Sequence, residues 1–166
     1  MSGILAIDPG TTQSGWVHFV NGSVTDGGIA DNYVLLSLIE KGFTIADRMA
    51  IEMIANQGRP AVGQDVFDTC VWIGQFKHAW GNDNTCKLIY RRDVKNHICG
   101  SARAKDANIR QAIIDLFPRT GGGKVPQTGT KAKPGPLYGM RSHMWSALAV
   151  AITAESRFDG NQNAGR

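Results

Sequence analysis

The chain has 166 residues and a net charge of +4, with 42% of its residues hydrophobic and 19% charged. This length and composition suit one globular domain with a sizeable core, and they argue against a disordered protein or a coiled coil. No run approaches the roughly 18 apolar residues of a membrane span, and the N-terminus lacks the basic flank of a secretion signal. We therefore expect no membrane partner.

Charge is unevenly distributed along the chain. Residues 1–86 contain 4 basic and 9 acidic residues, whereas residues 87–141 contain 12 basic and 3 acidic ones. A basic segment of this size commonly has a polyanionic partner, because each neutralised phosphate releases counterions. A basic face kept only for solubility would have the same composition.

The three cysteines, Cys70, Cys86 and Cys99, show neither CxxC spacing nor clustering. An odd number of separated cysteines fits free thiols in a reducing compartment better than disulfides or a zinc site. We therefore expect a cytoplasmic protein.

The first thirty residues predict an antiparallel meander. Residues 4–8 form a short apolar run that ends at an aspartate before Pro-Gly, the pattern of a buried strand that enters a tight turn. Residues 14–20 alternate as a second strand, and an Asn-Gly pair then predicts a hairpin into a third strand at residues 23–30.

After the meander, helices alternate with two further strands, and three helices follow the last strand. Apolar spacing and capping signals predict helices at residues 31–41, 65–80, 91–99, 104–117 and 142–158, and strands at residues 49–54 and 87–90. A meander followed by βαβ crossovers predicts an α/β fold, a mixed five-stranded sheet with helices on both faces.

Two segments carry no periodic pattern. Residues 119–138 are rich in Gly, Pro and Lys, which predicts a mobile loop. Residues 159–166 form a polar tail that we expect to fray, so the predicted domain is residues 1–158.

Three residues combine into a candidate site. Asp8 ends an apolar strand, Glu52 lies inside the run Ala-Ile-Glu-Met-Ile, and His143 stands near the start of the last helix. Each has a simpler interpretation, as a turn former, an outward-facing strand residue and a surface histidine. A buried acid, however, needs a partner or a cation. If the two strands are neighbours, the carboxylates and the imidazole could hold Mg²⁺ or Mn²⁺.

Four segments, in chain order, resemble the RuvC family of Holliday junction resolvases, within the RNase H-like superfold. They are ILAIDPGTTQSGW at residues 4–16, AIE at residues 50–52, IYRRDVK at residues 89–95 and SHMWSALAVA at residues 142–151. The resemblance spans about residues 4–153.

The resemblance implies roles for the candidate site. Asp8 would bridge two metal ions, Glu52 would ligate one of them, and His143 would be a third ligand or a base, with Lys95 beside the cut strand. Ser146 departs from the pattern, because the family usually has Asp three residues after the third ligand. A neutral hydroxyl in that ligand position could mean a weaker second metal site, a ligand from elsewhere, a three-ligand site or impaired cutting.

The basic residues of the second half, with two residues of the loop after Glu52, are the candidate DNA contacts. Such side chains hold phosphate without reading sequence, although any one of them could simply be a solvated charge. The set is Gln57, Arg59, Arg92, Lys95, Arg103, Lys105, Lys124, Lys131, Lys133 and Arg141.

The implied function is a Mg²⁺-dependent endonuclease, with Mn²⁺ as a substitute and two ions per site. It would resolve four-way or other branched DNA to 5′-phosphate and 3′-hydroxyl ends, as a homodimer in a bacterial or phage-infected cell. Trp72, Ile73, Phe76 and Trp80 are core residues by default, and by analogy with the family they could build the dimer face.

Two alternative functions stay open, and two nucleotide-binding interpretations are set aside. A junction-binding module without efficient cleavage would account for Ser146, and a nuclease of flaps or forks would use the same chemistry. An actin-like ATPase would need a second phosphate loop, and Gly-Gly-Gly-Lys at residues 121–124 lacks the P-loop frame, so no nucleotide cofactor is expected.

Overall fold

The computed structural model describes residues 3–42, 46–55, 58 and 61–163. Its elements, in chain order, are β1 (Gly3–Asp8), β2 (Gln13–Val20), β3 (Ser23–Asp31), α1 (Asn32–Glu40), β4 (Arg48–Met53), α2 (Gln64–Trp80), the short 3-10 helix η1 (Asp83–Thr85), β5 (Cys86–Tyr90), α3 (Arg91–Cys99), α4 (Asp106–Leu116) and α5 (Met144–Asn163).

The five strands form one mixed sheet in the order β3-β2-β1-β4-β5. β1 and β2 pair antiparallel, as do β2 and β3, whereas β4 runs parallel to both β1 and β5. The predicted mixed five-stranded sheet with an antiparallel meander is therefore confirmed.

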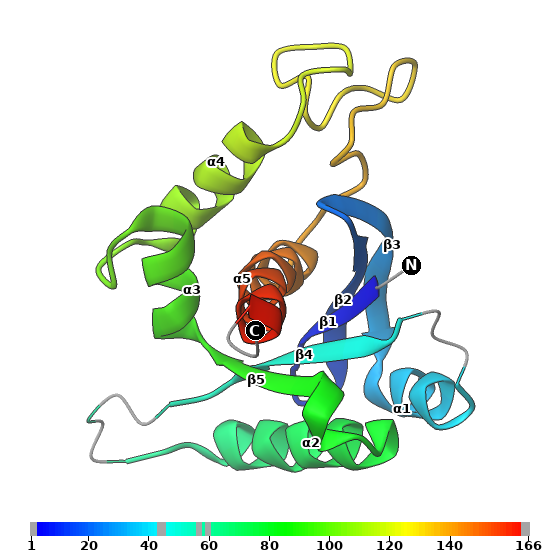
Figure 1. Ribbon diagram of the computed structural model, residues 1–166, viewed down its shortest axis with the longest axis vertical. Coiled ribbons are helices and arrows are strands. Elements are labelled where there is room, and N and C mark those ends of the chain that lie inside the picture. Colours follow the sequence, from blue (N-terminus) through cyan, green and yellow to red (C-terminus); the bar gives the residue numbers. More distant parts are fainter. Residues whose placement is uncertain (1–2, 43–45, 56–57, 59–60, 164–166) are drawn as a thin grey trace.

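Helices cover both faces of the sheet, as the strand pattern predicts (Figure 1). In β1, Ile4 and Ala6 belong to the core under α5, α3 and α4, whereas Leu5 and Ile7 belong to the core under α1 and α2. This alternation is the two-residue period of a strand that is buried on both faces.

Helix α5 lies directly on the sheet, between it and the outer helices α3 and α4 (Figure 1). Its Ala-Leu-Ala-Val-Ala run, residues 147–151, is fully buried, because small side chains let the helix pack closely on both sides.

Helix α5 continues to Asn163, so the predicted end at residue 158 is wrong. Asp159 pairs with Arg48 of β4 at 3.5 Å, which gives the extra turn an attachment. Residues 164–166 lie outside the described part of the chain.

Residues 119–141, which we name the glycine-rich arm, connect α4 to α5 and project beyond the sheet (Figure 1). The prediction of a mobile loop overlooked its internal structure. Backbone N–H groups of Gly121 and Gly122 donate to carbonyls of Pro126 and Lys133, both at 2.8 Å. Gly129 has φ +72°, and a Cβ there would lie 2.2 Å from the nitrogen of Gly135. The arm is compact because glycine allows its backbone segments to touch.

Three aromatic residues of α2, Trp72, Phe76 and Trp80, make contacts within the domain. Ile73 and Phe76 are buried in the core between the sheet and α2. Trp72 contacts Phe76 with ring centroids 5.8 Å apart, and Trp80 donates from Nε1 to Thr85 Oγ1 at 2.9 Å. These contacts favour the core interpretation of this helix.

The other predicted elements agree with the structure to within two residues at each end. The start of α4 shifts from residue 104 to Asp106, because Lys105 is the capping residue, whose backbone N–H donates to Asn108 Oδ1 at 2.9 Å. The three cysteines are free thiols, as predicted.

Candidate active site

Asp8 and Glu52 lie side by side at the same edge of the sheet. Asp8 is the last residue of β1, and the parallel pairing of Ile7 with Ile51 places Glu52 next to it on β4. Their side chains are only 14% and 16% exposed. Two acids more than forty residues apart in the sequence therefore lie next to each other in one partly desolvated site, as the sequence predicts.

His143 reaches this pair from the residue before α5. Its Nδ1 is 2.8 Å from Oδ2 of Asp8, and its side chain is 64% exposed. Gly15 of β2, which pairs with Asp8, makes this approach possible, because a Cβ there would lie 2.5 Å from the carbonyl carbon of His143. The three predicted residues are thus brought together.

A buried hydrogen-bond network shapes the turn that follows Asp8. Ser14 Oγ donates to Asn32 Oδ1 at 2.6 Å, and Asn32 Nδ2 donates to the carbonyl oxygen of Gly10 at 2.9 Å. Because both side chains are buried and satisfied, they fix the loop against β2 and α1. Ser14 belongs to the motif at residues 4–16, but its distant partner Asn32 has no signal in the sequence.

The two carboxyl groups have perturbed acidities. Burial raises the pKa of Glu52 to about 7, and the negative charge of Asp8 adds to this, while Arg91 opposes it. Burial also raises the pKa of Asp8, against the lowering influence of His143 and Arg91. Adjacent desolvated acids resist simultaneous ionisation unless a cation compensates them.

Arg91, the first residue of α3, supplies a cation from the protein itself. Its Nη1 is 3.8 Å from Oε1 of Glu52, and its Nη2 makes a close ion pair with Asp106 at the start of α4. Among the described residues, buried Nη1 has no hydrogen-bond partner. The sequence predicts Arg92 as a DNA contact, whereas nothing in its pattern distinguishes Arg91.

The donor set fits a divalent cation such as Mg²⁺. Within the described ranges, no three His, Cys, Asp or Glu side chains are arranged to hold one ion together. Mg²⁺, however, usually binds through one or two carboxylates and completes its shell with water and substrate phosphate. Asp8 and Glu52, adjacent and desolvated, meet that requirement.

Arg91 lines two hollows, one of which is also lined by the two carboxylates. One, of about 610 Å³, is lined by Asp8 and Glu52 together with Arg92 and Lys95. The other, of about 420 Å³, is lined by residues from α4 and the start of α5, namely Asp106, Ile109, Arg110, Ser142, His143, Trp145 and Ser146. The predicted basic residues Arg92 and Lys95 thus lie beside the acids, and Ser146 shares a hollow with His143.

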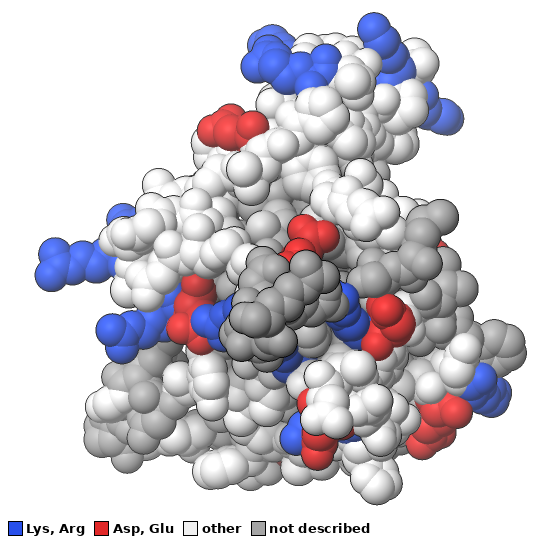
Figure 2. Space-filling model, viewed as in Figure 1, with Lys and Arg blue, Asp and Glu red and all other residues white. Residues whose placement is uncertain are grey.

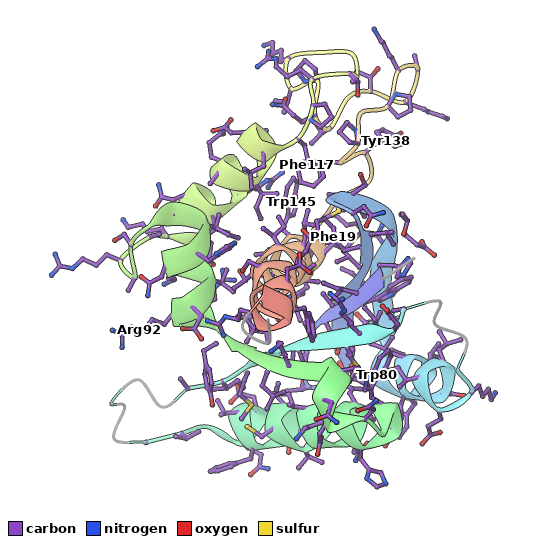
Figure 3. All side chains as sticks on the ribbon, in the orientation of Figure 1. Phe19, Trp80, Arg92, Phe117, Tyr138 and Trp145 are labelled. Atoms are coloured by element: carbon purple, nitrogen blue, oxygen red, sulfur yellow. The ribbon has the colours of Figure 1, made fainter. Side chains whose placement is uncertain are left out.

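The remaining predicted DNA contacts are spread over α4 and the arm. Arg103 and Lys105 are exposed just before α4, and Figure 3 shows Arg92 projecting outward from α3. Figure 2 shows Lys and Arg side chains at the outer end of the arm, and the arm contains the exposed residues Lys124, Lys131 and Lys133. Arg141 is exposed near His143. Gln57 and Arg59 lie outside the described residues.

The base of the arm is anchored between the helices. Phe117 and Trp145 lie in the space between α4 and α5 in Figure 3, and both are buried. The guanidinium of Arg110 stacks on the Trp145 ring at 4.6 Å from its centroid. Leu137 of the arm belongs to the same buried cluster as Phe117, Trp145 and the core residues of α5, so the arm packs on the helix that follows His143.

Solved structures of RuvC from Thermus thermophilus share this fold. One, in complex with a Holliday junction substrate, matches with a TM-score of 0.65 and 16% identity over 92% of this chain and 92% of that chain. Another RuvC structure matches with a TM-score of 0.60 and 16% identity over 95% of this chain and 96% of that one. Neither a family model nor a curated protein sequence matches the chain. The predicted RuvC-like fold is confirmed.

Among the described residues, no helix combines the length and the apolar character needed to cross a bilayer.

Proposed function

We propose that this chain is a metal-dependent endonuclease that cuts four-way or other branched DNA. The observation that carries the proposal is the adjacency of Asp8 and Glu52 at the ends of β1 and β4, with His143 on Asp8. The shared fold adds support, because one structure with this fold is a RuvC bound to a Holliday junction substrate.

The carboxylates of Asp8 and Glu52 would hold Mg²⁺, for which Mn²⁺ can substitute. A bound cation pair would stabilise charge on the attacking and leaving oxygens of a phosphodiester. The hydrogen bond from the His143 ring orients the Asp8 carboxylate, and it leaves Nε2 as the ring nitrogen that can exchange a proton with water or substrate. The products would carry 5′-phosphate and 3′-hydroxyl ends.

Basic side chains around the acids would hold the DNA backbone. Lys95 and Arg92 share a hollow with Asp8 and Glu52, so they can neutralise the phosphate nearest the cut. The arm adds a second basic surface, because residues 116–154 contain no Asp or Glu. We assign Lys124, Lys131, Lys133 and Arg141 to this surface, and we include Arg103 and Lys105, just before α4, among the DNA contacts.

Symmetric cutting of a four-way junction needs two active sites, so we propose that the chain works as a homodimer. Exposed apolar residues of α1 and α2, such as Tyr33, Phe67 and Val71, are available on the face opposite α5.

A second candidate is a junction-binding module that cuts poorly. Ser146 favours it, because this neutral side chain lines the hollow beside His143 where a further carboxylate would strengthen cation binding.

Incubation with an end-labelled four-way junction in Mg²⁺, Mn²⁺ or EDTA separates the two candidates. The nuclease predicts paired, metal-dependent cuts whose nicks DNA ligase can seal, since sealing requires a 5′-phosphate and a 3′-hydroxyl. Binding without incision in either metal would favour the module. Flap, fork and linear duplex substrates in parallel define the preferred structure, and equal cutting of linear duplex would contradict branch selectivity.

A further inference from the structure

The guanidinium of Arg91 is shared unequally between two carboxylates. It makes its close ion pair with Asp106, whose side chain is 84% exposed, and stands 3.8 Å from Glu52, whose side chain is 16% exposed. A buried pair is screened less than an exposed one, so attraction alone would favour the opposite arrangement.

The unequal sharing leaves a buried donor unused. Nη1 of Arg91 faces Glu52 at a distance too long for a hydrogen bond, and it finds no other partner in the described part of the chain. A buried donor without an acceptor is unfavourable, and a charge-assisted bond to Glu52 would relieve it. A movement of about 1 Å would form that bond, since such bonds are about 2.7–2.9 Å long.

Asp106 is the contact that opposes this movement. Arg91 begins α3 and Asp106 begins α4, so each is attached to a separate helix whose packing fixes its backbone. The pairing through Nη2 draws the guanidinium toward α4, away from the strand that carries Glu52.

We propose that Asp106 is a positioning residue that holds Arg91 off Glu52 and so keeps the Glu52 carboxylate free for a cation. This inference rests on the cation site of the proposed function. Without Asp106, Arg91 closes on Glu52 and competes with the metal for the same oxygens.

The test is Mn²⁺ binding to the DNA-free protein, measured by titration calorimetry. Asp106→Asn is expected to weaken Mn²⁺ binding roughly tenfold, the size of effect expected when one charge-assisted hydrogen bond must be broken. Asp115→Asn is the matched control, because it removes the same charge from the exposed end of α4 and is expected to leave the affinity unchanged.

The double variant Arg91→Gln with Asp106→Asn gives the decisive comparison with Arg91→Gln alone. With the competing guanidinium gone, the loss caused by Asp106→Asn is expected to disappear. A merely structural role for the ion pair predicts instead that Arg91→Gln alone weakens Mn²⁺ binding as much as Asp106→Asn does, because either substitution breaks the pair, whereas the proposal predicts no loss in Arg91→Gln. A crystal structure of Asp106→Asn is expected to show Nη1 within hydrogen-bond distance of Glu52.

The outcomes separate this inference from the proposed function. If wild type binds Mn²⁺ and Asp106→Asn behaves like Asp115→Asn, this inference is wrong while the proposed function stands. A loss that persists in the Arg91→Gln background also overturns it, since Asp106 would then act on the cation without Arg91. If wild type takes up no Mn²⁺, the cation site is absent, and the proposed function and this inference fail together.

Discussion

The carboxylate site and the glycine-rich arm carry charge in opposite physical settings. Asp8 and Glu52 are desolvated neighbours at the end of two central strands, and each changes the acidity of the other. The lysines of the arm are exposed and lie on a loop without a single acid (Figure 2). The charges of the site therefore interact strongly with a few buried neighbours. Each exposed lysine of the arm interacts only weakly with its surroundings, so the arm acts through the sum of many charges.

This difference separates two tasks in the proposed function. Buried charges interact strongly with the groups beside them, so they respond to pH and to bound cations. Exposed lysines act together through counterion release, so their effect decreases as salt increases. A change at the site should therefore alter cutting more than binding, and a change in the arm should do the reverse.

Asp8→Asn should produce the largest effect. A catalytic cation provides several kcal/mol of transition-state stabilisation, so its loss should slow cleavage by roughly a thousandfold or more. Junction affinity in EDTA should stay close to that of wild type. Single-turnover cleavage and an electrophoretic mobility shift measure the two quantities, with Asp115→Asn as the charge-matched control. Undiminished cleavage would show that Asp8 has no catalytic role.

Glu52 should make the metal-free protein less stable as pH rises. Its pKa is raised from 4.5 to about 7, so the folded protein keeps a proton that the unfolded chain releases in this interval. The resulting stability is fully present below about pH 4.5 and is lost as pH rises through about 7, a change on the order of 3 kcal/mol.

Urea denaturation of wild type and Glu52→Gln in EDTA, at about pH 5 and about pH 8, isolates this contribution. The stability of wild type relative to the variant should decrease between the two pH values. An increase would mean that Glu52 is stabilised as the anion.

Gly129→Ala should loosen the arm while leaving the carboxylate site intact. The new Cβ would meet the backbone of Gly135, in addition to the strain of φ +72°. Gly139→Ala is the matched control, because its φ is +82° but nothing lies within 4 Å of the added atom. We expect Gly129→Ala to destabilise the arm by about 2 kcal/mol more than Gly139→Ala does. Limited proteolysis of the arm measures this, and equal protection of the two variants would show that its packing is unimportant.

Removal of two arm lysines should have the smallest effect of these changes. It should weaken junction binding and reduce the dependence of that binding on salt concentration. The variant Lys131→Ala with Lys133→Ala should bind the junction more weakly at low salt. The slope of log affinity against log salt should decrease by about 2, one unit for each phosphate contact. Lys41→Ala with Lys77→Ala removes the same charge from the α1 and α2 side. Indistinguishable slopes for the two double variants would exclude the arm from the DNA interface.

Much of the fold could be predicted because local pattern and tertiary structure agree. The apolar runs before Asp8 and around Glu52 are short and bounded by turn residues, and they are the central parallel strands. The meeting of these acids follows from strand adjacency alone, since neighbouring parallel strands end at the same edge of a sheet.

Other parts of the site had no comparable signal. Arg91 and Asp106 belong to different helices, and a sequence pattern carries no information on which of several cations and acids will pair. The packing of Gly121, Gly129 and Gly135 against backbone atoms is likewise non-local, so the arm resembled an unstructured loop in composition. The end of α5 was underestimated because Asp159 and Gly160 are weak helix formers, while the pairing with Arg48 lies outside the helix.

The most direct test of the central claim is anomalous diffraction from a crystal soaked in Mn²⁺. The account predicts Mn²⁺ bound by the carboxylates of Asp8 and Glu52, beside His143, and no ion at this position in Asp8→Asn. A wild-type crystal that binds Mn²⁺ only elsewhere, or not at all, would contradict it.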